Sequence, residues 1–217
     1  MSIHKEKYKK ILSELNGKAT LVAVSKTKSV EDIQAFYDEG HRDFGENYVR
    51  EMVDKAAMLP KDIHWHFIGH LQSNKVKYIA SFIHLIHGID SESLLKEINK
   101  QAKKNSRIIE CLLQVHIATE ETKFGFDENE LLNLKAVQFE NVKIKGLMGM
   151  ASFSDDMHLV RCEFKKLKSL YDQFSTTHFP LSILSMGMSN DYKIAIEEGS
   201  NMVRIGSLLF GERNYNQ

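Results

Sequence analysis

Short, largely apolar segments alternate with amphipathic helical segments along the whole of this sequence, and that alternation restricts the fold more than any other feature. Eight segments have the length and composition of strands in a parallel sheet. The predicted strands cover residues 20–26, 42–47, 63–69, 85–90, 107–116, 142–150, 184–188 and 201–206. Strict alternation implies a parallel sheet, and this number of repeats favours closure into a (β/α)₈ barrel of the TIM type.

The whole chain, residues 1–217, is expected to form this single α/β barrel domain, preceded by an N-terminal helix. Lysines alternate with Tyr8, Ile11 and Leu12 in the first helix, which gives it one solvated face. An open, doubly wound sheet is the alternative architecture. It is disfavoured because no Gly-x-Gly-x-x-Gly follows the first strand and no P-loop motif occurs anywhere.

Charge and composition exclude several classes of function. The 29 basic and 29 acidic side chains cancel, so no overall field attracts nucleic acid or anionic lipid. No apolar run approaches membrane-spanning length, and the first residues lack the hydrophobic core of a signal peptide. Cys111 and Cys162 are isolated, which favours reduced thiols. We therefore expect a cytoplasmic protein, and we take it to be a monomer.

Lys26 stands at the end of the first predicted strand, and Ser29 is a plausible N-cap for the helix that follows. The carboxyl ends of barrel strands form the active-site rim, so a lysine there is placed for chemistry. A partly desolvated amine has a lowered pKa and can form a Schiff base with an aldehyde. The alternative is a lysine that leaves the barrel and reaches solvent.

The ends of the last two strands carry a second signal. The segments 185–191 and 204–207 bring small residues, hydroxyls and exposed amides to neighbouring strand ends, where barrels usually bind phosphate. Ordinary turn chemistry accounts for the same residues when they are taken alone. A lysine amine that faces a phosphate site across the barrel mouth is what pyridoxal 5′-phosphate (PLP) requires.

Five motifs in order along the chain resemble those of the pyridoxal phosphate homeostasis protein family, which is related to the N-terminal barrel of alanine racemase. They are Val24-Ser25-Lys26-Thr27-Lys28, Phe44-Gly45-Glu46-Asn47-Tyr48, Trp65-His66-Phe67-Ile68-Gly69-His70-Leu71-Gln72, Ser185-Met186-Gly187-Met188-Ser189 and Val203-Arg204-Ile205-Gly206-Ser207. The resemblance covers essentially the whole chain. It implies a role in vitamin B6 homeostasis without robust catalytic turnover, with PLP as cofactor and PLP-dependent apoenzymes as partners.

The same resemblance implies roles for particular residues. Lys26 would hold PLP as a Schiff base, Arg204 would face the pyridine nitrogen, and Asn47 would line the ring pocket. The phosphate would be bound by Ser189, Gly206 and Ser207, and Met188 completes the predicted cofactor-binding set. The chain departs from its relatives at His116, Gly149 and Ser152, where they more often carry Asn and a Thr with Pro. No catalytic residue is predicted.

A slow PLP-dependent amino-acid racemase is the alternative function. Racemases of this fold, by resemblance, take a catalytic tyrosine from a second domain, whereas only residues 212–217 follow Gly211 in this sequence. A guanidinium can only donate to the ring nitrogen, which makes the cofactor a weaker electron sink. The alternative for Arg204 is an ion pair with a strand-end carboxylate such as Glu46.

Three histidines near the third strand raise the question of a metal. His64, His66 and His70 form His-x-His-x-x-x-His, and such a pair at a strand end can hold zinc in a hydrolase. No carboxylate cluster or further histidine recurs at corresponding strand ends. We therefore predict no metal and expect these side chains to be packed or hydrogen-bonded.

Overall fold

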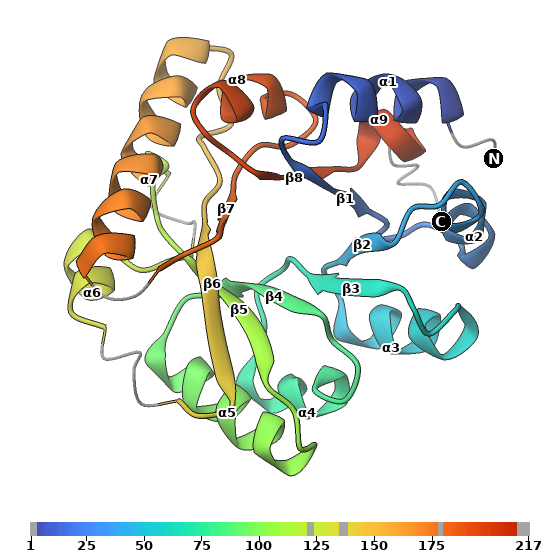
Figure 1. Ribbon diagram of the computed structural model, residues 1–217, viewed down its shortest axis with the longest axis horizontal. Coiled ribbons are helices and arrows are strands. Elements are labelled where there is room, and N and C mark those ends of the chain that lie inside the picture. The colour runs from blue at the N-terminus through green and yellow to red at the C-terminus, as the bar shows by residue number, and fades with distance from the viewer. Residues whose placement is uncertain (1–3, 121–123, 135–138, 178–179, 212–217) are drawn as a thin grey trace.

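A computed structural model describes residues 4–120, 124–134, 139–177 and 180–211. Its strands form one closed barrel in chain order, β1 to β8, and every neighbouring pair is parallel (Figure 1). The strands are β1 (Thr20–Val24), β2 (Asp43–Glu46), β3 (His64–Phe67), β4 (Leu85–Ile89), β5 (Ile109–Gln114), β6 (Val142–Met148), β7 (Ile183–Ser185) and β8 (Met202–Ile205). The predicted TIM barrel is confirmed.

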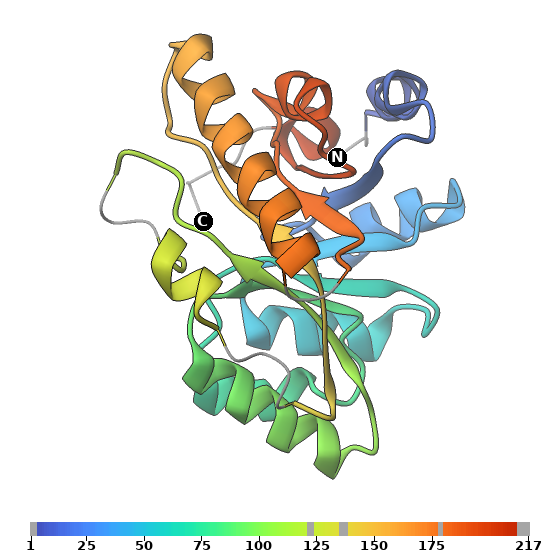
Figure 2. The ribbon, with the colours of Figure 1, turned by 60° about the vertical axis from the view of Figure 1, so that its left-hand side comes forward.

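Helices surround the barrel and follow each strand. They are α1 (Lys5–Leu15), α2 (Val30–Asp38), α3 (Val49–Met58), η1 (Ser73–Lys75), α4 (Val76–Ile79), α5 (Glu92–Lys104), α6 (Glu128–Leu132), α7 (Met157–Thr177), α8 (Tyr192–Glu197) and α9 (Ser207–Phe210). The N-terminal helix α1 lies beside α9 (Figure 1), and α7 runs along the outside of β6 and β7 (Figure 2). Ser29 caps α2 as predicted, because its Oγ accepts from the Asp32 amide at 3.1 Å.

The observed strands are shorter than the predicted ones, chiefly at their carboxyl ends. β1 ends at Val24, and Lys26 lies two residues further on in a turn. Loops leave the ladder here to line the barrel mouth, so apolar sequence alone does not mark the last paired residue. The fifth strand also begins later than predicted, at Ile109, and Ile108 is 62% exposed instead of forming part of its apolar body.

Two apolar clusters hold the fold together. The larger one fills the space between the barrel and its helices, and a small one inside the barrel comprises Val22, Leu85, Leu112, Met148 and Met202. The barrel interior also holds polar side chains that are almost fully buried, namely His66, His87, Ser185 and Arg204. Buried polar groups need hydrogen-bond partners, and these four supply one another.

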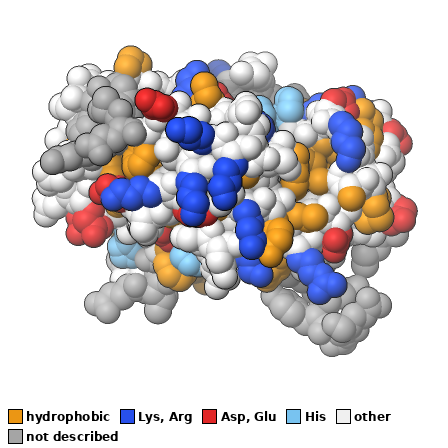
Figure 3. Space-filling view, turned by 90° about the horizontal axis from the view of Figure 1, so that it is seen from below, with side chains coloured by type: hydrophobic (Ala, Val, Ile, Leu, Met, Phe, Trp, Pro, Cys, Tyr) orange, Lys and Arg blue, Asp and Glu red, His pale blue; other side chains and the backbone are white. Residues whose placement is uncertain are grey.

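The surface carries both signs of charge. On the side where α4 and α5 lie, basic side chains cross the middle of the face and acidic ones flank them (Figure 3). None of the helices in the described ranges is long and apolar enough to cross a membrane. Cys111 is buried and Cys162 is exposed, and neither is in a disulfide.

Candidate cofactor site

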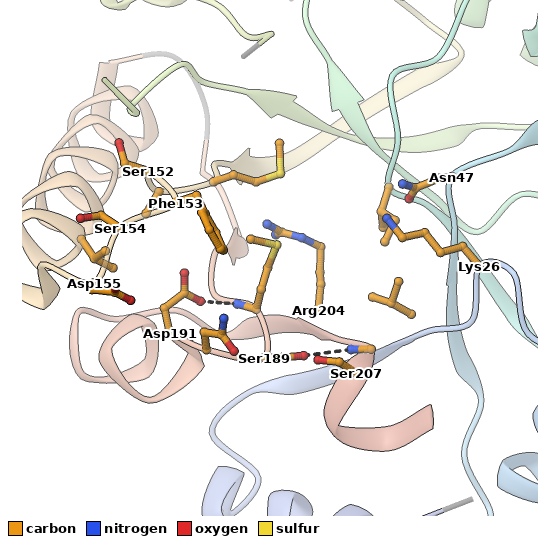
Figure 4. A pocket seen from close by; sticks show the side chains of 18 of the residues that line it. Lys26, Asn47, Ser152, Phe153, Ser154, Asp155, Ser189, Asp191, Arg204 and Ser207 are labelled. Atoms are coloured by element: carbon orange, nitrogen blue, oxygen red, sulfur yellow. Dashed lines mark hydrogen bonds between the residues drawn. The ribbon is translucent and has the colours of Figure 1, made fainter. Parts of the chain in front are cut away.

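A cavity of about 620 Å³ opens at the carboxyl ends of the strands, where a TIM barrel places its site. All of the residues predicted from the sequence to bind the cofactor line it. They are Lys26, Asn47, Met188, Ser189, Arg204, Gly206 and Ser207. In Figure 4 the Lys26 side chain extends into the cavity near Asn47. Ser189 and Ser207 lie below Arg204, at the ends of β7 and β8, and β8 is the neighbour of the strand that leads to Lys26.

The residue before Lys26 is fixed by a buried ion pair. Lys55 on α3 donates to Glu46 Oε1 and to the Ser25 carbonyl, both at 2.8 Å, and the Ser25 hydroxyl donates to the same carboxylate at 2.6 Å. Burial raises the pKa of Glu46, and the adjacent Lys55 ammonium opposes that rise. The alternative of an Arg204–Glu46 ion pair is therefore wrong, because Glu46 is engaged by Lys55 and Ser25.

The residue after Lys26 is fixed by the same helix. Thr27 adopts a left-handed conformation with φ of 63° and donates its amide to Glu51 Oε1 at 2.6 Å. Glu51 Oε1 also accepts from Lys55 Nζ at 2.7 Å. The chain on both sides of Lys26 is thus held by α3, which aims the lysine at the cavity. The sequence analysis did not identify Lys55 or Glu51.

Asn47 follows β2 and supplies a polar atom with no partner. Its Oδ1 is buried and has no hydrogen-bond partner among the residues that the structure describes. Such an atom costs free energy unless a ligand or water satisfies it. A ligand with a hydroxyl or N–H donor fits this position, and the 3′-hydroxyl of a pyridoxal ring is a donor of that kind.

A second wall of the cavity is formed by the turn that follows β7. Gly187 has φ of 96°, and a Cβ there would lie 2.6 Å from the Ala195 side chain, so only glycine fits. The Met188 amide donates to Asp191 Oδ1 at 2.5 Å, and the Gly206 amide donates to Ser189 Oγ at 3.4 Å. Asp191 occupies the N-cap position of α8, and its side chain accepts from the Met188 amide and makes no cap bond to the helix.

Ser207 opens α9 beside this turn. The amides of Leu209 and Phe210 donate to the Gly206 carbonyl, both at 2.9 Å. The amides of Ser207 and Leu208 open the helix, and they can meet an anion together with the hydroxyls of Ser189 and Ser207. A Cβ at Gly206 would lie 3.3 Å from Val24, which shows how closely β1 and β8 approach below the cavity. These donors suit a phosphate group.

Arg204 is buried and is held by three acceptors. Its Nη1 donates to the carbonyl and the hydroxyl of Ser185 at 3.0 and 2.6 Å, and its Nη2 donates to the Gly149 carbonyl at 3.0 Å. Burial lowers its pKa to about 10, and Asp191 opposes the shift, so the guanidinium is still charged at neutral pH. Its Nε hydrogen and second Nη2 hydrogen have no acceptor among the described residues, and both suit an acceptor such as a pyridine nitrogen.

The residues that depart from the family pattern have defined partners. His116 Nε2 lies 2.9 Å from the Glu120 carbonyl, and Ser152 bonds Glu163 through its amide and hydroxyl, both at 2.6 Å. A Cβ at Gly149 would lie 2.7 Å from a Leu167 methyl group, so the Leu167 side chain would have to shift to admit it. Ser152 also lines the cavity, with the 92% exposed Phe153 beside it (Figure 4).

The three histidines of the third strand separate into two places. His70 Nδ1 lies 2.9 Å from Asp90 Oδ2, beyond the carboxyl end of β3. His64 and His66 both meet Asp43 Oδ1, at 3.2 and 3.0 Å, at the amino-terminal end of the barrel. The fold therefore does not bring His64, His66 and His70 together as the ligands of one metal ion.

Comparison with known proteins first defines the class of protein. The model of the alanine racemase N-terminal domain family matches residues 4–214. The alanine racemase from Bartonella henselae, solved with covalently bound pyridoxal phosphate, shares this fold, with a TM-score of 0.71 and 18% identity. The match covers 97% of this chain and 60% of the racemase.

More similar proteins narrow that class. The pyridoxal phosphate homeostasis protein of Aquifex aeolicus is 43% identical over 201 residues, covering 91% of this chain and 88% of its own length. That of Schizosaccharomyces pombe is 40% identical, covering 94% and 88%. PipY of Synechococcus elongatus, solved with PLP bound, is 32% identical, with a TM-score of 0.89 and coverage of 95% and 99%. The chain belongs to the family of pyridoxal phosphate homeostasis proteins.

Proposed function

We propose that this chain binds PLP in the cavity at the barrel mouth, with Lys26 as the covalent attachment site through a Schiff base. Its role is vitamin B6 homeostasis, without robust catalytic turnover. The observation that carries the proposal is the arrangement in Figure 4: an amine after β1, hydroxyl and amide donors after the neighbouring strands β7 and β8, and a buried guanidinium beside them, all lining one cavity. PipY, with PLP bound, has the same fold at 32% identity.

Each group of residues has a separate task in this proposal. Lys26 supplies the nucleophilic amine, held in place by the α3 contacts to Ser25 and Thr27. Ser189, Gly206 and Ser207 bind the phosphate through hydroxyl and amide donors, and Asn47 Oδ1 accepts from the ring hydroxyl. PLP, when bound, supplies an aldehyde and a ring that withdraws electrons from an attached amino acid.

Arg204 limits what that ring can do. A guanidinium held by Ser185 and Gly149 remains charged and has only donors to offer, so it keeps the ring nitrogen unprotonated. An unprotonated ring withdraws electrons weakly. The described residues that line the cavity include no histidine or tyrosine, and the carboxylate of Asp191 already accepts from the Met188 amide. Both features favour a carrier over the alternative, a slow amino-acid racemase.

The decisive experiment maps the attachment site. Purified protein loaded with PLP is reduced with borohydride, digested and analysed by mass spectrometry. The expected result is one pyridoxyl adduct, on Lys26. Lys28, which also lines the cavity, is the matched control lysine, and Lys28→Ala should keep the adduct. An adduct that remains in Lys26→Ala, or one found on Lys28, contradicts the proposal.

The partners and location form the remaining part of the proposal. A carrier is useful if it hands PLP to apoenzymes, and the net charge of zero gives no support for nucleic-acid or membrane partners. Free cysteines suit a cytoplasmic protein, and a monomer is the state we propose. Loaded protein mixed with a PLP-dependent apoenzyme should restore its activity as fast as free PLP does or faster. Failure of that transfer contradicts the carrier role while leaving the Lys26 site intact.

A further inference from the structure

A chain of hydrogen bonds crosses the barrel interior from Arg204 to the opposite end. Arg204 Nη1 bonds Ser185 Oγ at 2.6 Å, and Ser185 Oγ lies 3.5 Å from His87 Nδ1. His87 Nε2 lies 2.9 Å from His66 Nδ1, and His66 Nε2 lies 3.0 Å from Asp43 Oδ1. This series of hydrogen bonds therefore ends at the amino-terminal end of the barrel, away from the cavity that holds Lys26.

At that end, imidazoles gather around one carboxylate. Asp43 and His64 are the first residues of β2 and β3, and they are paired in register. His84 directly precedes β4, and its ring stacks on His64 with 4.4 Å between the centroids. One ligand atom each from Asp43, His66 and His84 lies within 4.8 Å of the other two. Burial increases from the exposed His84 to the buried His66, so the cluster can be reached from solvent.

We propose that Asp43, His66 and His84 form a zinc site at the amino-terminal end of the barrel. Zinc binds sets of two imidazoles and one carboxylate, which are ligands of intermediate hardness. The fourth position would be left for water or for the adjacent His64. The metal would replace the proton that His66 Nε2 now shares with Asp43. This site lies at the end of the barrel away from Lys26, and the hydrogen bonds through His87 and Ser185 connect it to Arg204.

The hydrogen bonds inside the barrel fix the ring of His66, as the ring of a metal-binding histidine needs to be fixed. A ligating histidine nearly always donates its other ring N–H to a neighbouring acceptor, which fixes the ring. His66 Nδ1 already faces His87 Nε2, and neither ring is exposed. His66 is thus oriented from inside the barrel before any metal arrives, whereas an isolated surface histidine is not.

The hydrogen-bond directions make the proposal specific. Without metal, the Asp43 carboxylate requires a proton on His66 Nε2, so His66 Nδ1 accepts and His87 Nε2 donates. The Ser185 hydroxyl then donates to His87 Nδ1. With zinc on His66 Nε2, the proton of that ring must be on Nδ1 and donate to His87 Nε2. His87 then carries its own proton on Nδ1, so both rings change tautomer and no proton is gained or lost.

Two measurements test the site. Protein treated with EDTA is titrated with Zn²⁺ in competition with a chromophoric chelator, and one zinc per chain is expected. His84→Ala removes an exposed ring and should weaken binding at least about tenfold, because loss of even an outer partner of a metal site costs about 10–100-fold. His70→Ala is the control, since His70 is also paired with a carboxylate, Asp90 at 2.9 Å. Equal affinity in wild type and His84→Ala overturns the proposal.

The second measurement reports on the buried ligand. Two-bond ¹H–¹⁵N correlation spectra distinguish the two tautomers of each histidine. Addition of Zn²⁺ should move the His87 proton from Nε2 to Nδ1. If zinc binds and His87 remains an Nε2–H tautomer, the metal is held by surface rings such as His64 and His84, and the proposal is wrong.

Discussion

Lys55 Nζ lies 2.8 Å from Glu46 Oε1, and this buried ion pair stands beneath the turn that carries Lys26. The Lys55 side chain is 6% exposed and that of Glu46 is not exposed. Lys55 also bonds Glu51 at 2.7 Å, and Glu51 in turn holds the Thr27 amide. The geometry of the turn therefore depends on a buried ion pair and on the half-buried carboxylate of Glu51.

Lys55→Met should destabilise the protein strongly. Removal of one partner from a buried ion pair leaves an uncompensated charge and costs about 3–5 kcal/mol. Urea unfolding followed by circular dichroism measures this loss. The double variant Lys55→Met with Glu46→Leu should recover much of it, because both charges are then gone. If Lys55→Met unfolds like wild type, the ion pair does not hold the turn.

The phosphate donors can be tested one at a time. Loss of one hydrogen bond to a charged group costs about 1.5–3 kcal/mol, so Ser207→Ala should weaken PLP binding by about one to two decades. Ser189→Ala should have an effect of the same order. Fluorescence titration of unloaded protein with PLP gives the dissociation constants. Ser182→Ala, on a serine that does not line the cavity, is the matched control. Unchanged affinity in both site variants places the phosphate elsewhere.

The strand order and the barrel could be predicted because each βα unit carries its own local pattern. The apolar segments are short, the helices are amphipathic, and capping residues such as Ser29 act within a few positions of the chain. That the site residues line one cavity could be predicted for a similar reason. Lys26, Ser189 and Arg204 lie at strand ends, and parallel strands bring their carboxyl ends together.

The supporting residues could not be found in this way. Lys55 lies on a helix among other charged residues, and nothing local distinguishes it from a solvated lysine. Its burial arises when α3 packs against β2 and places Glu46 beneath it. The His66–His87 contact likewise joins residues on different strands. The His-x-His pair is visible in the sequence, but its spacing to His70 suggests a group of three. In the structure His70 contacts Asp90, whereas the pair contacts Asp43.

Stability at mildly acidic pH should reflect His41. Burial lowers the pKa of His41 from its ordinary value of 6.5, and both ring nitrogens have partners, Tyr8 Oη at 3.3 Å and the Asp43 carbonyl at 2.9 Å. The unfolded chain takes up this proton near pH 6.5, whereas the folded chain does so only at lower pH. The contribution of His41 to the free energy of unfolding is therefore fully present above pH 6.5. It is lost as the pH falls toward the pKa of His41 in the folded protein.

His41→Gln removes this titration and should reduce the fall in unfolding free energy just below pH 6.5. Urea unfolding at a series of pH values measures the slope in wild type and in the variant. His158→Gln, at an exposed position on α7, is the control and should keep the wild-type slope. An unchanged slope in His41→Gln assigns the acid sensitivity to other groups.

The last prediction concerns turnover. Arg204 donates to the carbonyls of Ser185 and Gly149, so its orientation is fixed and it faces the cavity only as a donor. With the ring nitrogen unprotonated, and with neither histidine nor tyrosine among the described lining residues, the chain should exchange the α-hydrogen of an amino acid slowly. PLP-loaded protein is incubated with L-alanine or D-alanine, and the enantiomer ratio is followed by chiral chromatography. Lys26→Ala with the same concentration of free PLP measures the background. We expect rates far below about 1 per second, the lower end of ordinary enzyme turnover. A rate at or above that value, lost in Lys26→Ala, makes this chain a racemase, because the carrier proposal requires the chemistry at Lys26 to stop at attachment.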